Sequence, residues 1–515
     1  MARRSRHFDK DLVRRRSVFA RRALILGGVQ AAGIGVLGFR YYSLQVRDHP
    51  KHRQVAEANR RRDAVLEPKR GRIFDRFGEE LAANSTSFQV NFTPQNNEQN
   101  SSTLLRLFEI LRLSDSEIAS FTQRLIEHDS LHTVSVAEDI DRDSAVAVDS
   151  ELLNLPGVSV VERDTRVYPF GEIAAHVVGY VRRPDARDLE DDQDPLLRMP
   201  GFKVGQTGVE GTMERTLRGA AGILQNEIDA HGNRVREIRR ILPQRGRDLE
   251  LTIDVGLHQS ITQRLATDLA VEEGAVVVMD VHSGEVLASV SYPTYDPNGF
   301  VGRIDQNWYE RIRTNPFKPQ LNRVLVAKYP PASTYKMLPL LAALESGQFS
   351  TDHKVTCQGF YDVGETEDGE YRRRFHCWQR RGHGELNMQE ALKNSCDVYL
   401  YDLVAGESGL GHEKTIEVAR QFGLGEQICV DLIGEASGTV PDENYKLTKF
   451  GDAWRTGDSI NSSIGQGFWE TTPLQLATMT ARLVNGGYAV RPHYVQPDMP
   501  YDWPRINVSG ANLDR

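Results

Sequence analysis

The chain has 515 residues and a formal net charge of −8, with 39% hydrophobic and 26% charged residues. These proportions are ordinary for a globular protein and exclude an intrinsically disordered or fibrous chain. The length predicts about three domains.

The N-terminus predicts a membrane anchor. Residues 1–22 carry nine Lys or Arg against two Asp, and they lead directly into an uncharged apolar stretch, Ala23 to Phe39. A basic run can bind nucleic acid, but beside an apolar segment it is typical of a cytoplasmic flank. We therefore predict a cytoplasmic tail (1–22), a transmembrane anchor (23–42) and an extracytoplasmic remainder. A cleaved signal peptide stays open as an alternative.

Residues 43–66 are basic and helical in pattern, which predicts a stalk. Short strands and polar turns follow to about residue 250. This part contains two short motifs with glycine, Arg70 to Arg76 (RGRIFDR) and Gly205 to Glu210 (GQTGVE). The acidic loop Asp188 to Asp194 predicts a solvated bulge with no catalytic part.

Strand and helix patterns alternate from residue 251. Gly274 to Asp280 and Ser283 to Ala288 predict two strands joined by a tight turn. Apolar runs predict helices at Met337 to Leu344 and at Pro473 to Val484, and Asn485-Gly486-Gly487 ends the second.

A serine and a lysine lie one helical turn apart at the mouth of the first apolar helix, in Tyr329-Pro-Pro-Ala-Ser333-Thr-Tyr-Lys336. At this spacing the two side chains share a face, so Lys336 can reach the Ser333 hydroxyl. A lysine activates a serine only where burial or a nearby cation lowers its pKa. The four letters S-x-x-K alone also fit an exposed helix start with a capping serine.

The surrounding motifs favour catalysis. Ser395-Cys396-Asp397 follows about 60 residues later, and Ile464 to Gly467 (IGQG) and Thr472 to Ala477 come after it. In this order, and with the two motifs before residue 250, the chain resembles the class B penicillin-binding transpeptidases. The resemblance covers roughly residues 60–490.

The resemblance implies an α+β fold in two parts. A pedestal of the penicillin-binding protein dimerisation type would occupy 43–250. A penicillin-binding/β-lactamase-like transpeptidase domain, an antiparallel sheet flanked by helices, would occupy 251–515. The serine would stand at the N-terminus of a central helix.

The resemblance also implies the chemistry. Ser333 attacks the carbonyl between the two terminal D-alanines of a peptidoglycan stem peptide, and Lys336 is the base. Ser395 relays a proton, while Asp397 and Asn394 orient the site. The acyl group then passes to an amine of a neighbouring stem peptide. β-Lactams acylate the same serine, and the implied partners are a membrane glycosyltransferase and rod-elongation proteins, with no nucleic acid.

One family motif is missing from the given sequence. The family's third motif, K-[ST]-G, should follow Tyr488, and no such triplet lies between Leu483 and Arg515. That strand supplies an oxyanion donor, whose loss costs about 2.7 to 4 kcal/mol. We therefore expect a C-terminally truncated chain with weak or no crosslinking activity.

Four cysteines leave two possibilities open. Cys357 and Cys377 can form a disulfide that closes a loop of about 20 residues and stabilises by roughly 3 kcal/mol. Alternatively, thiolate and imidazole ligands suit tetrahedral zinc. The elongation branch of the family has such a site, and its matching positions here are Asp362, Cys377, His383 and Cys396, with Cys357 as a substitute for Asp362.

Other functions stay open. Asp397, Cys396 and His383 favour the elongation branch over the division-specific enzyme, which remains the alternative within the class. A serine β-lactamase would need no pedestal or anchor, and a β-lactam sensor would carry further membrane helices. An inert scaffold that docks a wall-synthesis glycosyltransferase is the non-enzymatic alternative.

Overall fold

The structure is a computed structural model that describes residues 5–47, 61–94, 100–127, 133–228, 234–269, 271–302, 304–365 and 371–515. The chain divides into two compact units. The first consists of Met1–Glu67 and Ala221–Pro243, and the second of Pro68–Ala220 and Gln244–Arg515.

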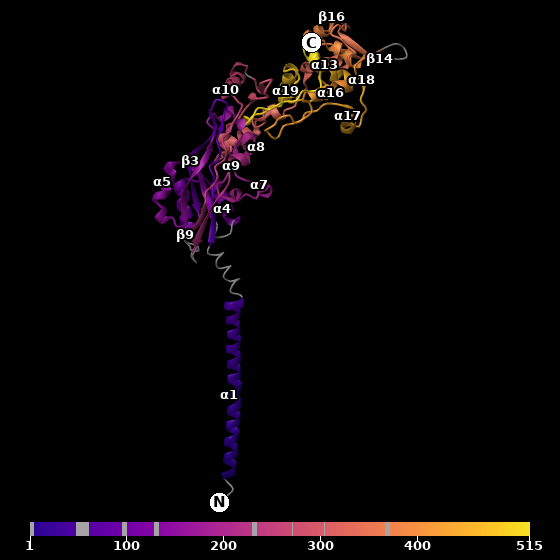
Figure 1. Ribbon diagram of the computed structural model, residues 1–515. Helices are drawn as coiled ribbons and strands as arrows, with labels where there is room; N and C mark the ends of the chain where they lie inside the picture. Colours follow the sequence, from indigo (N-terminus) through magenta and orange to yellow (C-terminus); the bar gives the residue numbers. More distant parts are fainter. Residues whose placement is uncertain are drawn as a thin grey trace. The chain divides into compact units, whose positions relative to one another are not determined.

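The first unit begins with α1 (Ser5–Tyr42), the long indigo helix of Figure 1, and the short π-helix η1 (Ser43–Arg47). Its segment Leu24–Gln45 is 22 residues long and apolar enough to cross a membrane. At about 1.5 Å per residue this segment is long enough for the hydrocarbon core of a bilayer. Leu26 and Val36 are 67% and 69% exposed, so these side chains need apolar surroundings outside the chain.

The same unit contains an antiparallel sheet in the order β1-β8-β9. Its strands are β1 (Arg61–Leu66), β8 (Gly222–Ile228) and β9 (Arg234–Ile241). The predicted stalk is therefore wrong for residues 61–66, and its residues 48–60 lie outside the described residues. Strand β1 forms because it pairs along its whole length with β8, a partner more than 150 residues away that a local pattern does not reveal.

The first half of the second unit is built on a sheet in the order β10-β2-β3-β4, with β5 paired to β3. Its apolar core lies between this sheet and the neighbouring helices and includes Val90, Phe92, Leu107 and Phe121. The strands are β2 (Ile73–Phe74), β3 (Glu80–Phe92), β4 (Val134–Ile140), β5 (Val158–Val167), β6 (Val181–Arg182), β7 (Val204–Gly205) and β10 (Leu249–Glu250). The helices are α3 (Asn100–Leu111), α4 (Asp115–Glu127), α5 (Arg142–Ser150), η2 (Leu152–Asn154), η3 (Gly171–Ile173), α6 (Ala175–Val178), α7 (Ala186–Asp191), η4 (Pro195–Arg198), α8 (Gly208–Thr212) and α9 (Glu214–Arg218).

A buried ion network joins the RGRIFDR and GQTGVE motifs of this half. Glu210 of the second motif is fully buried, and its carboxylate accepts from Arg166 Nε at 2.6 Å and from Arg70 Nε at 2.8 Å. Arg70 belongs to the first motif and also pairs with Glu214. Gly71 beside it has no room for a side chain, because a Cβ there would lie 2.0 Å from the Arg247 carbonyl oxygen. The motifs are thus separate in sequence and joined in the fold.

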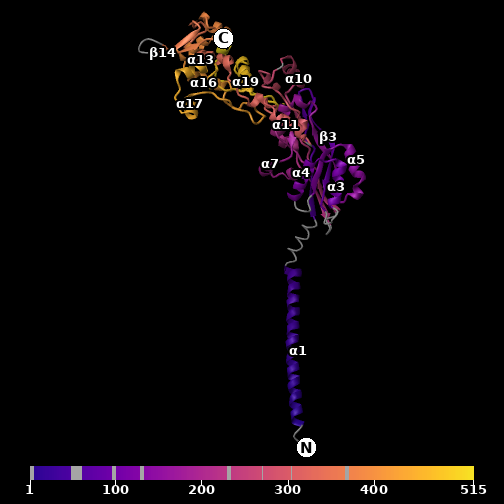
Figure 2. The same ribbon diagram turned by 180° about the vertical axis from the view of Figure 1, so that it is seen from behind.

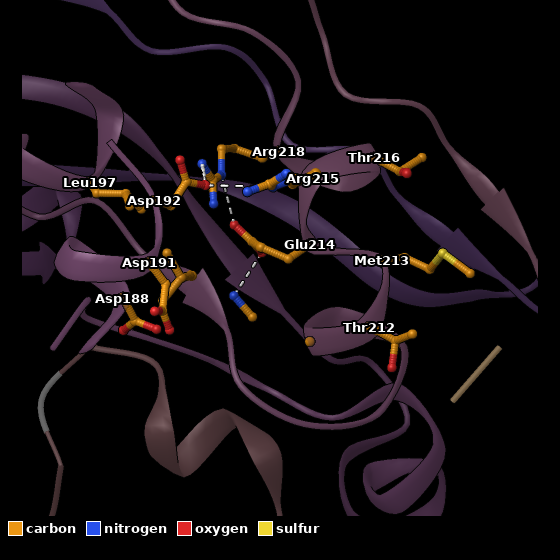
Figure 3. A pocket seen from close by; sticks show the side chains of 13 residues that line it. Asp188, Asp191, Asp192, Leu197, Thr212, Met213, Glu214, Arg215, Thr216 and Arg218 are labelled. Atoms are coloured by element: carbon orange, nitrogen blue, oxygen red, sulfur yellow. Dashed lines mark hydrogen bonds and ion pairs between the residues drawn. The ribbon is translucent and has the colours of Figure 1, made fainter. Parts of the chain in front are cut away.

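The acidic loop is only in part the solvated bulge that its composition predicts: Glu190 and Asp191 are exposed, but its other carboxylates are paired with arginines. Asp192 and Asp194 each accept from Arg218 Nη1 at 3.0 Å, and Asp188 accepts from Arg182. Figure 3 shows Arg218 between Asp192 and Glu214 at a cavity of about 340 Å³. The carboxylates hold this loop against α9, so the loop has a structural role.

We expect Glu210→Ala to lower the free energy of unfolding by about 3–5 kcal/mol, because it leaves the buried Arg166 guanidinium without its carboxylate partner and Arg70 with Glu214 alone. Burial alone would raise the pKa of Glu210, but Arg166 and Arg70 together lower it below its ordinary value. A carboxylate whose pKa is lowered in the folded state stabilises the folded protein at pH values above its unfolded-state pKa. This contribution is lost as the pH falls through the folded-state pKa. Urea unfolding at pH 7 and pH 4 measures both effects.

The control is Glu190→Ala, which removes an exposed carboxylate of the acidic loop. A Glu210→Ala protein as stable as this control at pH 7 would contradict a structural role for the buried network.

The second half of this unit contains the predicted strand–turn–strand, observed as the antiparallel pair β11 (Gly274–Met279) and β12 (Val286–Tyr292). Helices α10 (Val255–Gln263) and α19 (Pro473–Val484) contact this pair, so the predicted sheet flanked by helices is confirmed. Both predicted apolar helices are present, the first as α13 (Met337–Ser346).

The remaining strands of this half are β13 (Val355–Cys357), β14 (Phe360–Glu365), β15 (Tyr371–His376) and β16 (Gly384–Leu386). Its remaining helices are η5 (Arg264–Asp268), η6 (Pro297–Phe300), α11 (Gln306–Thr314), α12 (Arg323–Val326), η7 (Ala332–Lys336), α14 (Met388–Lys393), α15 (Asp397–Ala405), α16 (His412–Gln421), α17 (Glu443–Phe450), α18 (Thr456–Ser463) and α20 (Gly510–Leu513).

The largest apolar core surrounds α13. Leu338, Leu341 and Ala343 of this helix pack in one cluster with Leu400 of α15 and Ile460 of α18. Both ribbon views show α13 and α16 side by side, and the C-terminal segment lies near α13 (Figures 1 and 2). The helix that follows the S-x-x-K motif is therefore fixed by packing on several sides.

Candidate active site

Ser333 lies in the short 3₁₀ turn η7, directly before α13. Its neighbour Ala332 has a φ of +49°, a left-handed conformation that is unfavourable for a residue with a Cβ. The turn leaves the Ser333 side chain exposed, whereas Lys336, one turn later, is only 1% exposed. The predicted helix start is thus a tighter turn that separates an accessible hydroxyl from a buried amine.

Gly465 holds this turn in place. Its carbonyl oxygen accepts from the Ala332 N–H at 2.9 Å, and its φ is +70°. A Cβ at Gly465 would lie 2.4 Å from the Ala332 carbonyl oxygen and 2.7 Å from the Tyr335 Cβ. The IGQG motif therefore needs glycine here so that its backbone can touch the Ser333 turn.

We expect Gly465→Ala to slow acylation of Ser333 by a fluorescent penicillin by roughly 10²-fold, because a displacement of about 1 Å at a reacting group has an effect of this size. Gly451→Ala is the matched control. Gly451 has a φ of +66° but no atom within 4 Å of an added Cβ, so the control carries the backbone strain without the contact. Equal acylation rates in the two variants would show that the contact does not position Ser333.

Lys336 reaches Ser333 through Ser395. Lys336 Nζ donates to Ser395 Oγ at 3.0 Å, and Ser395 Oγ donates to Ser333 Oγ at 3.1 Å. The predicted direct contact between Lys336 and Ser333 is wrong: in the described structure the Ser395 hydroxyl stands between them. Because hydroxyl hydrogens rotate, the same two hydrogen bonds can carry a proton from Ser333 to the amine or back.

Asp397 fixes the other side of the lysine. Its Oδ1 accepts from Lys336 Nζ at 2.6 Å and its Oδ2 accepts from the Trp378 backbone N–H at 2.9 Å. Lys336 also donates to the Ser395 carbonyl oxygen at 2.8 Å. Ser395 has a φ of +49°, so both motifs of the site contain a left-handed residue. Asn394, the other predicted orienting residue, instead donates from Nδ2 to the Glu390 carbonyl of its own helix.

These groups line one cavity of about 460 Å³. Its lining residues are Ser333, His376, Cys377, Trp378, Arg380, Ser395, Asp397, Tyr401, Ile464 and Gln466. The sequence motifs indicated the two serines, the aspartate and the IGQG segment but not His376, Trp378, Arg380 or Tyr401. For Trp378 and Arg380 the available signal was their position within three residues of Cys377.

The structure brings three cysteines and one histidine together beside this cavity. One ligand atom from each of Cys357, Cys377, His383 and Cys396 lies within 4.8 Å of the others, and Cys377 Sγ is 3.7 Å from His383 Nδ1. All four cysteines of the chain are free thiols, so the predicted disulfide alternative is not formed here. The Cys396 thiol lowers the pKa of Cys377 by hydrogen bonding to its thiolate.

Asp362 does not belong to this cluster. Its carboxylate accepts from Arg374 Nε at 2.7 Å and from Arg374 Nη2 at 2.8 Å, across the hairpin of β14 and β15. The residue that completes the cluster is instead Cys357, the substitute for Asp362 that the sequence offered. The register of this hairpin places Arg374 directly opposite Asp362, which explains why Asp362 pairs with Arg374 and does not join the cysteines.

Comparisons with known proteins agree with this arrangement. Residues 65–251 match the penicillin-binding protein dimerisation domain, and residues 274–508 match the penicillin-binding protein transpeptidase domain. The peptidoglycan D,D-transpeptidase MrdA of Acinetobacter baumannii is 32% identical over 95% of this chain and 71% of its own length.

Two solved structures are also similar. The complex between penicillin-binding protein PBP2 and MreC from Helicobacter pylori gives a TM-score of 0.78 at 29% identity, covering 88% of this chain and 83% of that chain. A structure described as the coordination of polymerization and crosslinking by a peptidoglycan synthase complex gives a TM-score of 0.65 at 26% identity, covering 96% and 83%. The chain therefore belongs to the penicillin-binding proteins, in the branch of the MrdA peptidoglycan D,D-transpeptidases.

Proposed function

We propose that this protein is an elongation-type peptidoglycan D,D-transpeptidase that crosslinks stem peptides through a serine acyl-enzyme and binds penicillin. The observation that carries the proposal is the path of two hydrogen bonds from Ser333 through Ser395 to the buried Lys336. An exposed hydroxyl joined to a buried amine is the arrangement that nucleophilic catalysis by serine requires.

Each residue then has a role. Ser333 Oγ attacks the carbonyl between the two terminal D-alanines while Lys336 is in its neutral amine form. The Ser333 proton passes to Ser395, and the Ser395 proton passes to the lone pair of Lys336 Nζ. On collapse of the tetrahedral intermediate the same path returns a proton to the leaving D-alanine amine. Asp397 holds Lys336 in place through its 2.6 Å hydrogen bond. The acyl group on Ser333 then transfers to an amine of a second stem peptide.

Labelling with a fluorescent penicillin tests this function against the inert scaffold. The enzyme gives a covalent fluorescent band that excess unlabelled penicillin suppresses. A scaffold gives no band, and that result would remove the transpeptidase function for the chain as given.

We further propose that Cys357, Cys377, His383 and Cys396 hold one structural zinc ion. Three thiols and an imidazole, all within 4.8 Å, form a donor set that suits tetrahedral zinc with no open position. When bound, the ion would supply a fixed crosslink between β13, the segment after β15 and the start of α15. Cys396 lies between Ser395 and Asp397, so the crosslink would hold the second catalytic motif.

Metal analysis of protein purified without chelators should find about one zinc ion per chain. We expect Cys357→Ser to lose most of this zinc and to lower the melting temperature, while Cys429→Ser, a free cysteine outside the cluster, keeps it. Zinc well below stoichiometric amounts, or a Cys357–Cys377 disulfide in a thiol count, would contradict the proposal.

The location and partners are part of the proposed function. The apolar segment Leu24–Gln45 supports a single-pass anchor in the bacterial inner membrane with the catalytic domain in the periplasm. The similar structures, one with MreC and one of a synthase complex, support rod-elongation proteins and a membrane glycosyltransferase as partners. Protease protection in spheroplasts tests the topology, and co-purification from membranes tests the partners; full protection, or no co-purified glycosyltransferase, would contradict them.

A further inference from the structure

The catalytic cavity has a cation that the mechanism above does not use. Arg380 lines the same cavity as Ser333, and its side chain is exposed. Lys336 is already paired with Asp397, but no carboxylate of the described residues lies within ion-pair distance of Arg380. Among the described residues, this positive charge is therefore available to bind an anion in the cavity.

Trp378 provides an apolar surface beside this cation. Its indole is 62% exposed, which is unusual for the largest apolar side chain. The indole N–H is nevertheless held, because it points at the carbonyl oxygens of Asn394 and Ser395, at 3.2 and 3.1 Å. The polar edge of the ring is thus fixed to the catalytic segment, and much of the remaining ring surface is accessible at the cavity.

The segment that carries both residues is fixed at its two ends. The Cys377 N–H donates to the Gly359 carbonyl at 3.0 Å, and the His383 N–H donates to the Cys357 carbonyl at 3.1 Å. Between them, the Gly382 N–H closes a turn on the Gln379 carbonyl. A fixed turn presents its side chains to a ligand with little loss of conformational entropy.

We infer that Arg380, with Trp378 beside it, is a specificity-determining residue that binds a carboxylate of the donor stem peptide. A guanidinium binds a carboxylate through two parallel hydrogen bonds. The face of the Trp378 indole would cover the aliphatic part of the substrate residue that carries this carboxylate. A stem peptide with lysine at its third position offers two such groups, the terminal carboxylate and the internal carboxylate of the γ-linked glutamate. This inference rests on the proposed function, since it names the substrate group that the same cavity recognises.

Calorimetric titration of the full chain in detergent tests the inference, with Ser333→Ala as the background so that binding is measured without acylation. The probes are the acetylated pentapeptide L-Ala-D-γ-Glu-L-Lys-D-Ala-D-Ala, its C-terminal amide, and its analogue with isoglutamine in place of glutamate. We expect Arg380→Ala to weaken binding of the parent peptide about 10- to 100-fold, as for the loss of a hydrogen bond to a charged group. Arg380→Lys should recover part of this loss.

The amidated peptides identify the carboxylate. The analogue that lacks the recognised group should bind Arg380→Ala and the background protein equally well, while the other analogue behaves like the parent. Arg381→Ala is the matched control, because this neighbouring arginine is exposed and does not line the cavity. It should bind all three peptides like the background protein, and thermal melting checks that each variant is folded.

Three results would overturn the inference. These are unchanged binding in Arg380→Ala, an equal loss for the parent and both amidated peptides, or an equal loss in Arg381→Ala. Absence of parent binding to the background protein also overturns it when the unsubstituted chain is still labelled by penicillin. If penicillin does not label the unsubstituted chain, the proposed function itself fails, so the two failures are distinguishable.

Discussion

Replacing Lys336 by methionine should slow acylation of Ser333 by penicillin by roughly 10²- to 10⁴-fold, the usual contribution of a general base. Methionine fills a similar volume but neither accepts a proton nor donates to Ser395. The same change removes the Nζ group that donates to Asp397 Oδ1 at 2.6 Å, and it leaves this carboxylate, only 9% exposed, without a charged partner. We therefore also expect a loss of stability of about 3–5 kcal/mol.

Stopped-flow acylation with fluorescent penicillin, on protein shown to be folded by circular dichroism, separates the two effects. Lys354→Met is the control, since Lys354 also pairs with a carboxylate, Glu385, but both side chains are more than half exposed. Such an exposed pair contributes about 1 kcal/mol at most. Acylation by a folded Lys336→Met protein at the rate of this control would contradict the role of Lys336 as the base.

Replacing Ser395 by alanine should have an effect of similar size, about 10²- to 10⁴-fold on the acylation rate, because it removes the hydroxyl that joins Ser333 to Lys336. The Ser395 carbonyl oxygen, which also accepts from Lys336, remains in place. Since the two residues act along one path, the Lys336→Met/Ser395→Ala double variant should be little slower than either single variant.

A direct transfer from Ser333 to Lys336 makes the opposite prediction. Ser395→Ala would then lower the rate by less than about tenfold, and the two substitutions would act additively on the activation free energy. This double-mutant cycle therefore decides between a lysine that touches the nucleophile and a lysine that acts through a second serine.

Local sequence patterns were sufficient to predict the main helices and strands that surround the site. The apolar run after Lys336 and the Thr472-Pro473 start of α19 predicted both helices. Helix α19 begins at the predicted residue because Thr472 and Gln475 form a capping box. The strand–turn–strand of β11 and β12 followed from the apolar residues on either side of the turn at Ser283-Gly284. These signals are local in sequence, so no knowledge of distant partners was needed.

Contacts between distant segments could not be predicted from such patterns. The spacing of Ser333 and Lys336 suggested a direct contact, but the position of Ser395 depends on the packing of α15 against α13. Asp362 matched a ligand position by its order in the sequence, but in the fold its carboxylate pairs with Arg374 on the neighbouring strand. Trp378 and Arg380 have no motif of their own, and only the fold shows that they line the cavity.

The most direct test is to find which residue carries the acyl group. The full chain is incubated with penicillin, digested, and mapped by mass spectrometry. A penicilloyl adduct on the peptide that contains Ser333, absent from Ser333→Ala and retained in Thr334→Ala, is the predicted result. An adduct on any other residue, or none in a folded protein, would contradict Ser333 as the nucleophile.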